Sequence, residues 1–367
     1  MKYLSFLIKP ASSICNLRCR YCFYEDESEK RAIKSMGIMT EQTAEKIILK
    51  AFEEIEPGGS ISFMFQGGEP TLAGLDFYKR FLSLEKIYGR PDVHVSHAIQ
   101  TNAMTITREW AEFFQKYNFL VGISLDGIQL IHDQNRVDVS GKGTWHHVIS
   151  SLKLLEEYQL DINILCVVTA QTVDHTEAVW KTLSGLENHP LQFIPCLDPI
   201  ESPRGNCQYS LTPKLYKDFL VRLFDCWYSD WKEGTYTSVR LFDDYLRILM
   251  GSSPSCCAAS GTCGHYLVVE GDGSLYPCDF YVLDQWYMGN IHNCTIQEAL
   301  NSTPSKKFVA DGRKRPESCK KCKYLQICRG GCKRDWTDAH SNYYCSAYRE
   351  FFDYALLKLQ SIARNCI

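Results

Sequence analysis

The sequence predicts an α/β fold: a partial (β/α)6 TIM-like barrel followed by a smaller cysteine-rich domain. Three observations lead to this prediction. β-like runs alternate with helical patterns through the first two hundred residues, several of these runs are almost wholly apolar, and the alternation gives way to cysteine-dense, turn-rich sequence at about residue 236. Near-continuous apolar runs are typical of parallel strands covered on both faces. The 367 residues suffice for one large domain, which we place at 1–235, and a smaller one at 236–367.

Six short β-like runs mark the expected strands of the barrel. They are Leu4–Ile8, Ile61–Phe65, Val95–Thr101, Leu120–Leu125, Ile162–Thr169 and Leu191–Ile194. The clearest helical pattern between them places apolar side chains on one face from Ala44 to Ile55 and stops at Pro57. Further helical patterns cover about 107–117, 146–158, 174–185 and 212–233. This alternation predicts βαβ units and a parallel sheet. Six units fall short of the eight of a closed barrel, so we expect an open barrel with its functional residues on the loops after the strands.

The composition excludes several classes of partner. The formal net charge of −3 gives no electrostatic reason to expect nucleic acid or a membrane surface. No apolar run approaches the ~18 residues of a membrane span. The apolar stretch after Met1 is too short for a signal peptide. We therefore expect a cytoplasmic protein.

Eighteen cysteines are many for such a chain, and disulfides are disfavoured in the cytoplasm. Three cysteines lie near the N-terminus, and ten lie between Cys256 and Cys345. Clustering at these spacings favours metal ligation over a disulfide framework. The other cysteines, and Cys294 within the second group, are expected to be ordinary thiols: Cys166, Cys196, Cys207, Cys226, Cys294 and Cys366.

The N-terminal group is a box of three cysteines, Cys15, Cys19 and Cys22, spaced x3 and then x2 directly after the first expected strand. Three thiolates on a short loop can hold three irons of a 4Fe–4S cluster and leave the fourth iron open for a substrate or cofactor. A cluster that only carries electrons takes four cysteines. The box alone is also compatible with a zinc knuckle or with chance clustering.

The second expected strand leads into Gln66-Gly67-Gly68-Glu69-Pro70. Paired glycines allow close approach of the backbone, and Glu69 could take an ammonium group. Alone, this segment is a routine turn between a strand and a loop. Together with the cysteine box it resembles the radical S-adenosylmethionine superfamily. The resemblance implies that the three cysteines hold a 4Fe–4S cluster whose open iron chelates S-adenosylmethionine. The residues that it assigns to this cofactor are Tyr21, Gly67, Gly68, Glu69, Ser124, Arg136 and Leu197.

Later strand ends offer further candidates, namely Gln100-Thr101-Asn102, Asp126-Gly127 and the segment from His132 to Arg136. Ala103 stands where the superfamily often has glycine. Each of these residues also has an ordinary interpretation as a cap, turn or core residue.

The C-terminal cysteines resemble the SPASM extension of radical enzymes that modify peptides. The pattern is Cys263-x9-Gly273-x4-Cys278, then Cys319-x2-Cys322-x5-Cys328-x3-Cys332, and finally Cys345. An eighth thiolate completes two four-cysteine clusters; Cys257 fits best, and the adjacent Cys256 keeps that choice open. The resemblance implies one cluster on Cys257, Cys263, Cys278 and Cys332, and a second on Cys319, Cys322, Cys328 and Cys345. Fully ligated clusters favour electron transfer as their role. A zinc ribbon is the alternative, because Cys-x2-Cys pairs commonly bind zinc.

The most specific resemblance is to anaerobic sulfatase-maturating enzymes, and it runs from Leu7-Ile8-Lys9-Pro10 to Asn342-Tyr343-Tyr344-Cys345. It implies oxidation of a cysteine or serine in a sulfatase motif of the Cys/Ser-x-Pro-x-Arg type to Cα-formylglycine, through a 5′-deoxyadenosyl radical. It also implies three 4Fe–4S clusters, a reducing partner such as flavodoxin or ferredoxin, and Asp279 as the base that takes the target's proton. Tyr24 and Gln66 are candidates for the substrate pocket.

Two other functions compete with this one. A SPASM enzyme could form a thioether, a carbon–carbon crosslink or an epimer in a ribosomal peptide. A non-catalytic electron-transfer or zinc-binding protein belongs to a different class, and iron and sulfide analysis would separate it from the enzymes.

Overall fold

A computed structural model describes residues 1–187, 189–337 and 339–365 of the chain. Its centre is one nine-stranded sheet with the strand order β6-β5-β4-β3-β2-β1-β7-β8-β9. The strands are β1 (Tyr3–Ile8), β2 (Ser60–Phe65), β3 (His94–Thr101), β4 (Leu120–Ser124), β5 (Ile162–Val168), β6 (Leu191–Pro195), β7 (Leu267–Val269), β8 (Ser274–Tyr276) and β9 (Gly289–Asn290).

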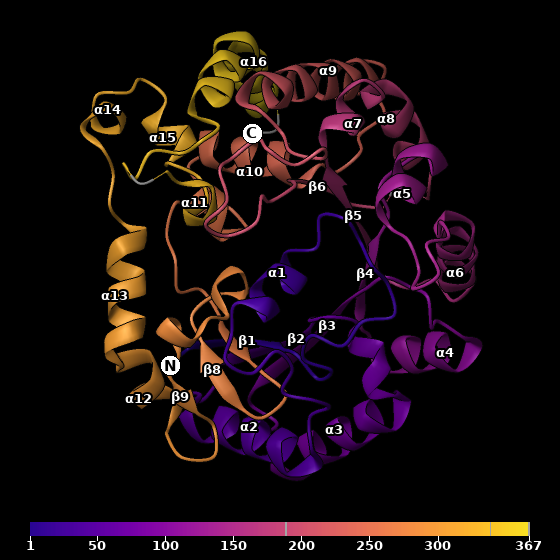
Figure 1. Cartoon of the computed structure of the whole chain (residues 1–367), viewed down its shortest axis with the longest axis vertical. Coiled ribbons are helices and arrows are strands. Elements are labelled where there is room, and N and C mark those ends of the chain that lie inside the picture. The colour runs from indigo at the N-terminus through magenta and orange to yellow at the C-terminus, as the bar shows by residue number, and fades with distance from the viewer. Residues whose placement is uncertain (188, 338, 366–367) are drawn as a thin grey trace.

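Helices α2, α3, α4, α6, α8 and α9 lie on the outer side of this sheet, whereas α1 lies inside its curve (Figure 1). The α-helices are α1 (Phe23–Glu29), α2 (Glu41–Glu54), α3 (Leu75–Tyr88), α4 (Arg108–Lys116), α5 (Gln129–Asn135), α6 (Trp145–Glu157), α7 (Ala170–Val173), α8 (Thr176–Ser184), α9 (Pro213–Lys232), α10 (Arg240–Leu249), α11 (Cys257–Ser260), α12 (Ile296–Asn301), α13 (Thr303–Gly312), α14 (Glu317–Lys320), α15 (Leu325–Cys328) and α16 (Cys345–Asn365). Short 3₁₀ helices are η1 (Pro70–Ala73), η2 (Asp279–Tyr281), η3 (Asp284–Trp286) and η4 (Lys333–Asp335). No described helix is long and apolar enough to cross a membrane.

The first six strands confirm the predicted partial barrel. Each pairs in parallel with the next strand along the chain, and their bounds differ from the predicted ones by at most one residue at either end. Helices follow the strands as expected; α9, for example, begins where Thr212 accepts a hydrogen bond from the backbone N–H of Leu215, with Pro213 in the first turn. The barrel is open because β1 pairs on its other side with β7 rather than with β6.

The cysteine-rich segment extends the barrel sheet, which the sequence analysis did not predict. Strand β7 pairs in parallel with β1, with Ile8 opposite Val269, and β8 and β9 continue the sheet as antiparallel strands. The segment also ends in a long helix, α16, that packs on α9; the rings of Phe224 and Phe351 are 5.8 Å apart. The division of the chain at residues 235 and 236 stays a prediction.

Candidate active site

The loops at the carboxyl ends of the barrel strands line one pocket. The cysteine box follows β1, the Gly67-Gly68 turn follows β2, Ser124 ends β4, and Leu197 follows β6. The pocket gathers every residue that the sequence analysis assigned to the open cluster, to S-adenosylmethionine and to the substrate, apart from Asp279. These residues are Cys15, Cys19, Cys22, Tyr21, Tyr24, Gln66, Gly67, Gly68, Glu69, Ser124, Arg136 and Leu197.

Close backbone contacts explain the paired glycines beside the cysteine box. The backbone N–H of Gly68 donates to Ser12 O at 2.8 Å, and that of Glu69 donates to Ile14 O at 2.8 Å. A Cβ atom on Gly68 would lie 2.2 Å from the Ile14 carbonyl oxygen, so only glycine fits there. Gly67 adopts a φ of 133°, in the region that favours glycine. The turn after β2 therefore holds the start of the cysteine loop in place.

Glu69 is buried, and hydrogen bonds from the protein already engage both of its carboxylate oxygens. Its Oε1 accepts hydrogen bonds from the Thr71 backbone, from Thr71 Oγ1 at 2.6 Å and from Thr101 Oγ1 at 2.8 Å, while its Oε2 accepts one from the Asn102 backbone at 2.8 Å. Burial raises the pKa of this carboxyl, and these hydrogen bonds oppose the rise. Glu69 thus ties the end of β3 to the glycine turn. That it also takes an ammonium group stays a prediction.

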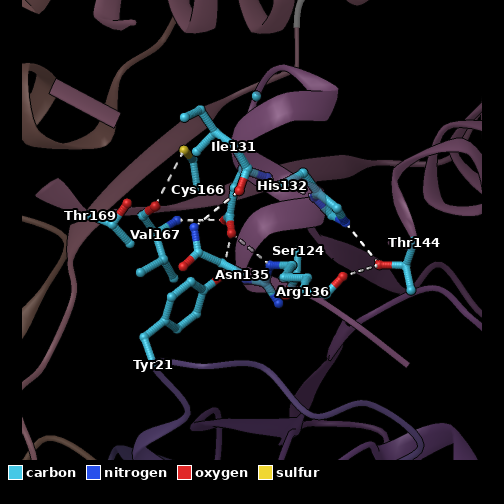
Figure 2. Close-up of polar contacts among 12 residues, drawn as sticks. Tyr21, Ser124, Ile131, His132, Asn135, Arg136, Thr144, Cys166, Val167 and Thr169 are labelled. Carbon is cyan, nitrogen blue, oxygen red and sulfur yellow. Dashed lines mark hydrogen bonds and ion pairs between the residues drawn. The ribbon is translucent and has the colours of Figure 1, made fainter. Parts of the chain in front are cut away.

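Arg136 and Tyr21, both labelled in Figure 2, converge on one buried carboxylate, that of Asp126. Arg136 Nε lies 3.0 Å from Asp126 Oδ2, the Tyr21 hydroxyl donates to the same oxygen, and the Val167 backbone donates to Oδ1 at 2.9 Å. Burial of Asp126 without these partners would be costly. The sequence analysis named Asp126 only as a strand-end candidate, and its place here is to fix two residues of the pocket wall.

Two further positions named in the sequence analysis, His132 and Ala103, have structural roles. The buried His132 accepts a hydrogen bond from the Asp126 backbone at Nδ1 and contacts Thr144 Oγ1 at 3.0 Å through Nε2, and burial lowers its pKa to about 4 (Figure 2). The neutral imidazole of His132 therefore links the Asp126 backbone to the Thr144 side chain. Ala103 has a φ of 62°, which explains why glycine is common at this position in the superfamily.

Asp279 is buried in η2, directly after Cys278, and contacts residues from the start of the chain. Its Oδ1 lies 3.3 Å from Lys9 Nζ and accepts a hydrogen bond from the Tyr24 hydroxyl. Its Oδ2 accepts a hydrogen bond from Gln66 Nε2 at 3.2 Å. Tyr24 and Gln66 line the pocket of the cysteine box, so Asp279 lies beside that pocket. The structure thus brings the predicted base and both substrate candidates together.

A buried charge network behind Asp279 escaped the sequence analysis. The Lys9 ammonium is 3.8 Å from Glu270 Oε1, and Arg31 Nη1 is 2.6 Å from the same oxygen. The ammonium also lies 4.0 Å from the centre of the Tyr24 ring. Lys9 and Glu270 each follow an apolar strand directly, and a charge at that position was the signal that could have revealed them.

Two separate pockets collect the C-terminal cysteines in the sets that the SPASM resemblance implies. One is lined by Cys257, Cys263, Cys278 and Cys332, and the other by Cys319, Cys322, Cys328 and Cys345. All eight are free thiols. Four thiols around one pocket form the donor set of a fully ligated iron–sulfur cluster, whereas the barrel pocket offers three. The donor sets therefore fit two closed clusters and one open one.

The structure distinguishes Cys256 from Cys257. Cys256 Sγ accepts a hydrogen bond from the Ala259 backbone at 3.4 Å as the N-cap of α11, and Cys256 does not line the four-cysteine pocket. Cys257, the first residue of that helix, does line it. The other cysteines of the described residues line neither four-cysteine pocket. Cys196 lines the barrel pocket and donates to Tyr209 O at 3.2 Å, and Cys366 lies outside the described residues.

An open parallel barrel with three cysteines at its mouth, extended by a segment that forms two four-cysteine pockets, defines a radical S-adenosylmethionine enzyme with auxiliary iron–sulfur sites. The matching family models agree: the radical SAM superfamily covers residues 10–182, and an iron-sulfur cluster-binding domain, SPASM, covers residues 257–323. The zinc-ribbon and non-catalytic interpretations are therefore not supported.

Comparison with individual proteins identifies the family within this superfamily. The chain is 44% identical to a cysteine-type anaerobic sulfatase-maturating enzyme of Clostridium novyi over 100% of this chain and 98% of that protein. It is 31% identical to a serine-type enzyme of Klebsiella aerogenes, covering 98% of this chain and 87% of that one. The solved structure of native anSMEcpe with bound AdoMet and Cp18Cys peptide superposes with a TM-score of 0.94 at 43% identity, over the full length of both chains. The chain belongs to the anaerobic sulfatase-maturating enzymes.

Proposed function

We propose that the enzyme oxidises a cysteine of a sulfatase, in a Cys-x-Pro-x-Arg type motif, to Cα-formylglycine with Asp279 as the proton acceptor. The observation that carries this proposal is the meeting of Asp279, Tyr24 and Gln66 beside the three-cysteine pocket. The preference for cysteine over serine rests on the higher identity to the cysteine-type relative. Formation of crosslinks or epimers in a ribosomal peptide has no comparable support, because the similarity to sulfatase-maturating enzymes extends over the whole chain.

The cysteine sets and pocket residues named above are the proposed binding groups. Cys15, Cys19 and Cys22 would hold the open cluster, and the two four-cysteine pockets would hold the auxiliary clusters. S-adenosylmethionine would lie against the glycine turn, where a Cβ atom on Gly67 would come within 2.9 Å of the Ser12 carbonyl oxygen, and against the side chains that line the pocket. When bound, the open cluster and S-adenosylmethionine supply hydrogen abstraction at the target carbon.

The protein's own residues supply the acid–base part of the reaction. The Lys9 ammonium lies 3.3 Å from Asp279 Oδ1, while Tyr24 and Gln66 fix the orientation of this carboxylate with one hydrogen bond to each oxygen. A carboxylate held in this way can accept the proton of the target thiol without reorganising. Because Asp279 adjoins Cys278, the electron that the substrate loses in the same step has a nearby exit toward the first auxiliary site.

The cellular setting follows from the same chemistry. A low-potential carrier such as flavodoxin or ferredoxin would supply reducing electrons, and a reducing cytoplasm would keep the cysteines free for iron.

Exchange of Asp279 for Asn tests the proposed base. Asn keeps the shape of the side chain but cannot accept the proton, so the variant is expected to cleave S-adenosylmethionine and to form no aldehyde. The assay incubates reduced, reconstituted enzyme with S-adenosylmethionine and matched peptides carrying cysteine, serine or alanine at the target position, and detects products by mass spectrometry. Asp284→Asn, an exposed carboxylate in η3, is the matched control.

Three outcomes would contradict parts of the proposal. Normal aldehyde formation by Asp279→Asn would refute the base. A faster reaction of the serine peptide would refute the cysteine preference. Cleavage of S-adenosylmethionine by the unaltered enzyme without aldehyde from either peptide would favour the modification of a ribosomal peptide.

A further inference from the structure

The charge of the chain is distributed unevenly. Residues 303–333 contain ten lysines and arginines but only two acidic residues, a net charge of +8, whereas the whole chain carries −3. The remainder of the molecule is therefore strongly acidic. A surface of the opposite sign on an acidic protein points to a specific partner.

Some of these basic side chains lie at the pocket of Cys319, Cys322, Cys328 and Cys345. Helices α13, α14 and α15 carry or flank most of them and lie at the outer edge of the molecule, away from the barrel strands (Figure 1). We define the basic face as six exposed residues: Arg313, Lys314, Lys320, Lys321, Lys323 and Arg349. Three of them, Lys321, Lys323 and Arg349, line the cysteine pocket itself.

Neighbouring acids neutralise the basic face only in part. Glu317 lies near both Lys320, at 3.2 Å, and Lys321, at 3.9 Å. Lys314 pairs with Asp311 at 2.7 Å, and Lys323 pairs with Asp353 at 2.8 Å. Exposed pairs of this kind are weak and exchange readily with a partner's charges. Within the described part of the chain, no acidic group lies within ion-pair distance of Arg313 or Arg349.

The other four-cysteine pocket has no exposed lysine or arginine among the described residues that line it. Its one lysine, Lys333, has its ammonium 4.0 Å from the centre of the Phe308 ring and 4.7 Å from that of Trp286. This cation is turned into an aromatic cluster rather than toward solvent. Among the described residues, the wall of the pocket of Cys319, Cys322, Cys328 and Cys345 contains exposed cationic side chains, whereas that of the other four-cysteine pocket contains only the half-buried Lys333.

We propose that the basic face docks an acidic one-electron carrier protein of the flavodoxin or ferredoxin class. The proposal deepens the proposed function, on which it rests. A cationic surface beside a redox site favours a redox protein over nucleic acid, because charge complementarity then brings the two electron-transfer groups together.

The electrons released in the oxidation of the target determine the role of the carrier protein. Conversion of the target –CH2–SH to a thioaldehyde removes one hydrogen atom from carbon, one proton to Asp279 and one electron. The oxidised form of the carrier accepts that electron and becomes reduced by one. Water then replaces sulfur at carbon, which releases hydrogen sulfide and leaves the aldehyde.

Binding to the cluster-loaded enzyme provides the first test. A purified acidic flavodoxin is titrated anaerobically by calorimetry from 50 to 300 mM salt. The expected Kd rises with salt, and at low salt it rises about tenfold in two variants, Lys320→Gln/Lys321→Gln/Lys323→Gln and Arg313→Glu/Lys314→Glu. The second variant leaves the segment of Cys319, Cys322 and Cys328 unchanged. Iron analysis confirms that both variants carry their iron–sulfur clusters. The matched control neutralises exposed lysines on the barrel helices: Lys79→Gln/Lys153→Gln/Lys181→Gln.

Turnover provides the second test. Flavodoxin-dependent aldehyde formation should fall about tenfold in both basic-face variants, whereas dithionite-driven formation should not change in Arg313→Glu/Lys314→Glu, whose residues do not line the cysteine pocket. The proposal would be overturned if the basic-face variants bound flavodoxin with an unaltered Kd, or if the barrel control lost as much affinity as they do. It would also be overturned if these variants lost binding to a 20-nucleotide RNA but still bound flavodoxin. Absence of aldehyde with dithionite in the unaltered enzyme would instead refute the proposed function, and the binding result would still stand.

Discussion

Replacement of Glu27 by Gln should make the enzyme more stable at neutral pH. Glu27 lies on α1 with only 2% of its surface exposed, and neither carboxylate oxygen has a hydrogen-bond partner among the described residues. Burial raises the pKa of this carboxyl from 4.5 to about 8, against the opposing charge of Lys9 and with support from Asp279. The folded protein therefore binds a proton at Glu27 that the unfolded chain releases at much lower pH.

The sign and size of the effect follow from this difference in proton binding. Between pH 4.5 and 8 the folded state binds more protons at Glu27 than the unfolded state, so stability is highest below pH 4.5 and falls as the pH rises toward 8. Each pH unit costs up to about 1.4 kcal/mol, which accumulates to about 4 kcal/mol at pH 7.5. Gln has no such proton and lacks this slope. The variant should match the wild type near pH 4.5 and exceed it increasingly above that value.

Urea unfolding of the cluster-loaded enzyme under anaerobic conditions, followed by circular dichroism from pH 5 to 8, measures the effect. The difference between variant and wild type cancels the titration of the cysteines, which both proteins share. Glu29→Gln, an exposed carboxylate on the same helix, should give a difference near zero throughout. The reasoning is refuted if Glu27→Gln shows no gain in stability from pH 5 to 8, since Glu27 would then be ionised in the folded protein at little cost.

Three other predictions concern the glycine turn, the choice between Cys256 and Cys257, and the ion pair of Arg136. Gly68→Ala should destabilise the enzyme by more than about 2 kcal/mol, measured from urea midpoints, because its Cβ atom would lie 2.2 Å from backbone. Cys257→Ser should reduce iron and sulfide below the roughly twelve irons of three clusters, whereas Cys256→Ser should retain them; the reverse would exchange the two assignments. Arg136→Met should cost about 3–5 kcal/mol of unfolding free energy because it leaves the buried Asp126 without its cation, and a loss below 1 kcal/mol would argue against this ion pair.

The sequence predicted the barrel strands well because their information is local. Each is a short apolar run that ends at a turn or polar segment, so its limits can be read without knowing its partners. The strands β7, β8 and β9 have two or three residues each, too few for a pattern, and the pairing of β7 with β1, which joins them to the barrel sheet, depends on contacts across more than 250 residues. Helix α16 is different: its apolar residues Phe351, Phe352, Leu359 and Ile362 have helical spacing, so the sequence analysis could have predicted it.

The same distinction between local and long-range information applies to the candidate site. The resemblance to SPASM sequences, rather than the spacing itself, implied the two sets of four cysteines, and each set lines one pocket of the structure. The choice between Cys256 and Cys257 depends on which thiol caps α11, a detail that spacing does not contain. The Lys9–Glu270 pair joins segments 261 residues apart, and no local pattern indicates that two such charges meet.

Alternation along three paired strands explains how the polar network around Asp279 is assembled. Leu7 of β1 lies opposite Met64 of β2 and Val268 of β7. Two residues further along each chain, and so on the same face, stands a polar residue. These three residues are Lys9, Gln66 and Glu270. The register of one apolar row therefore places an ammonium, an amide and a carboxylate side by side.

Asp279 reaches this polar row because the segment after β8 crosses the same face, where Leu7 and Val268 pack with Tyr276 and Val282. A slip of one residue between β1 and β7 would turn Glu270 away from Lys9 and remove the apolar contact that holds the segment. Extension of the barrel sheet by the cysteine-rich segment is thus what aligns the proposed base with the three-cysteine pocket on one side. The same pairing sets Cys278, next to that base, on the wall of the first four-cysteine pocket.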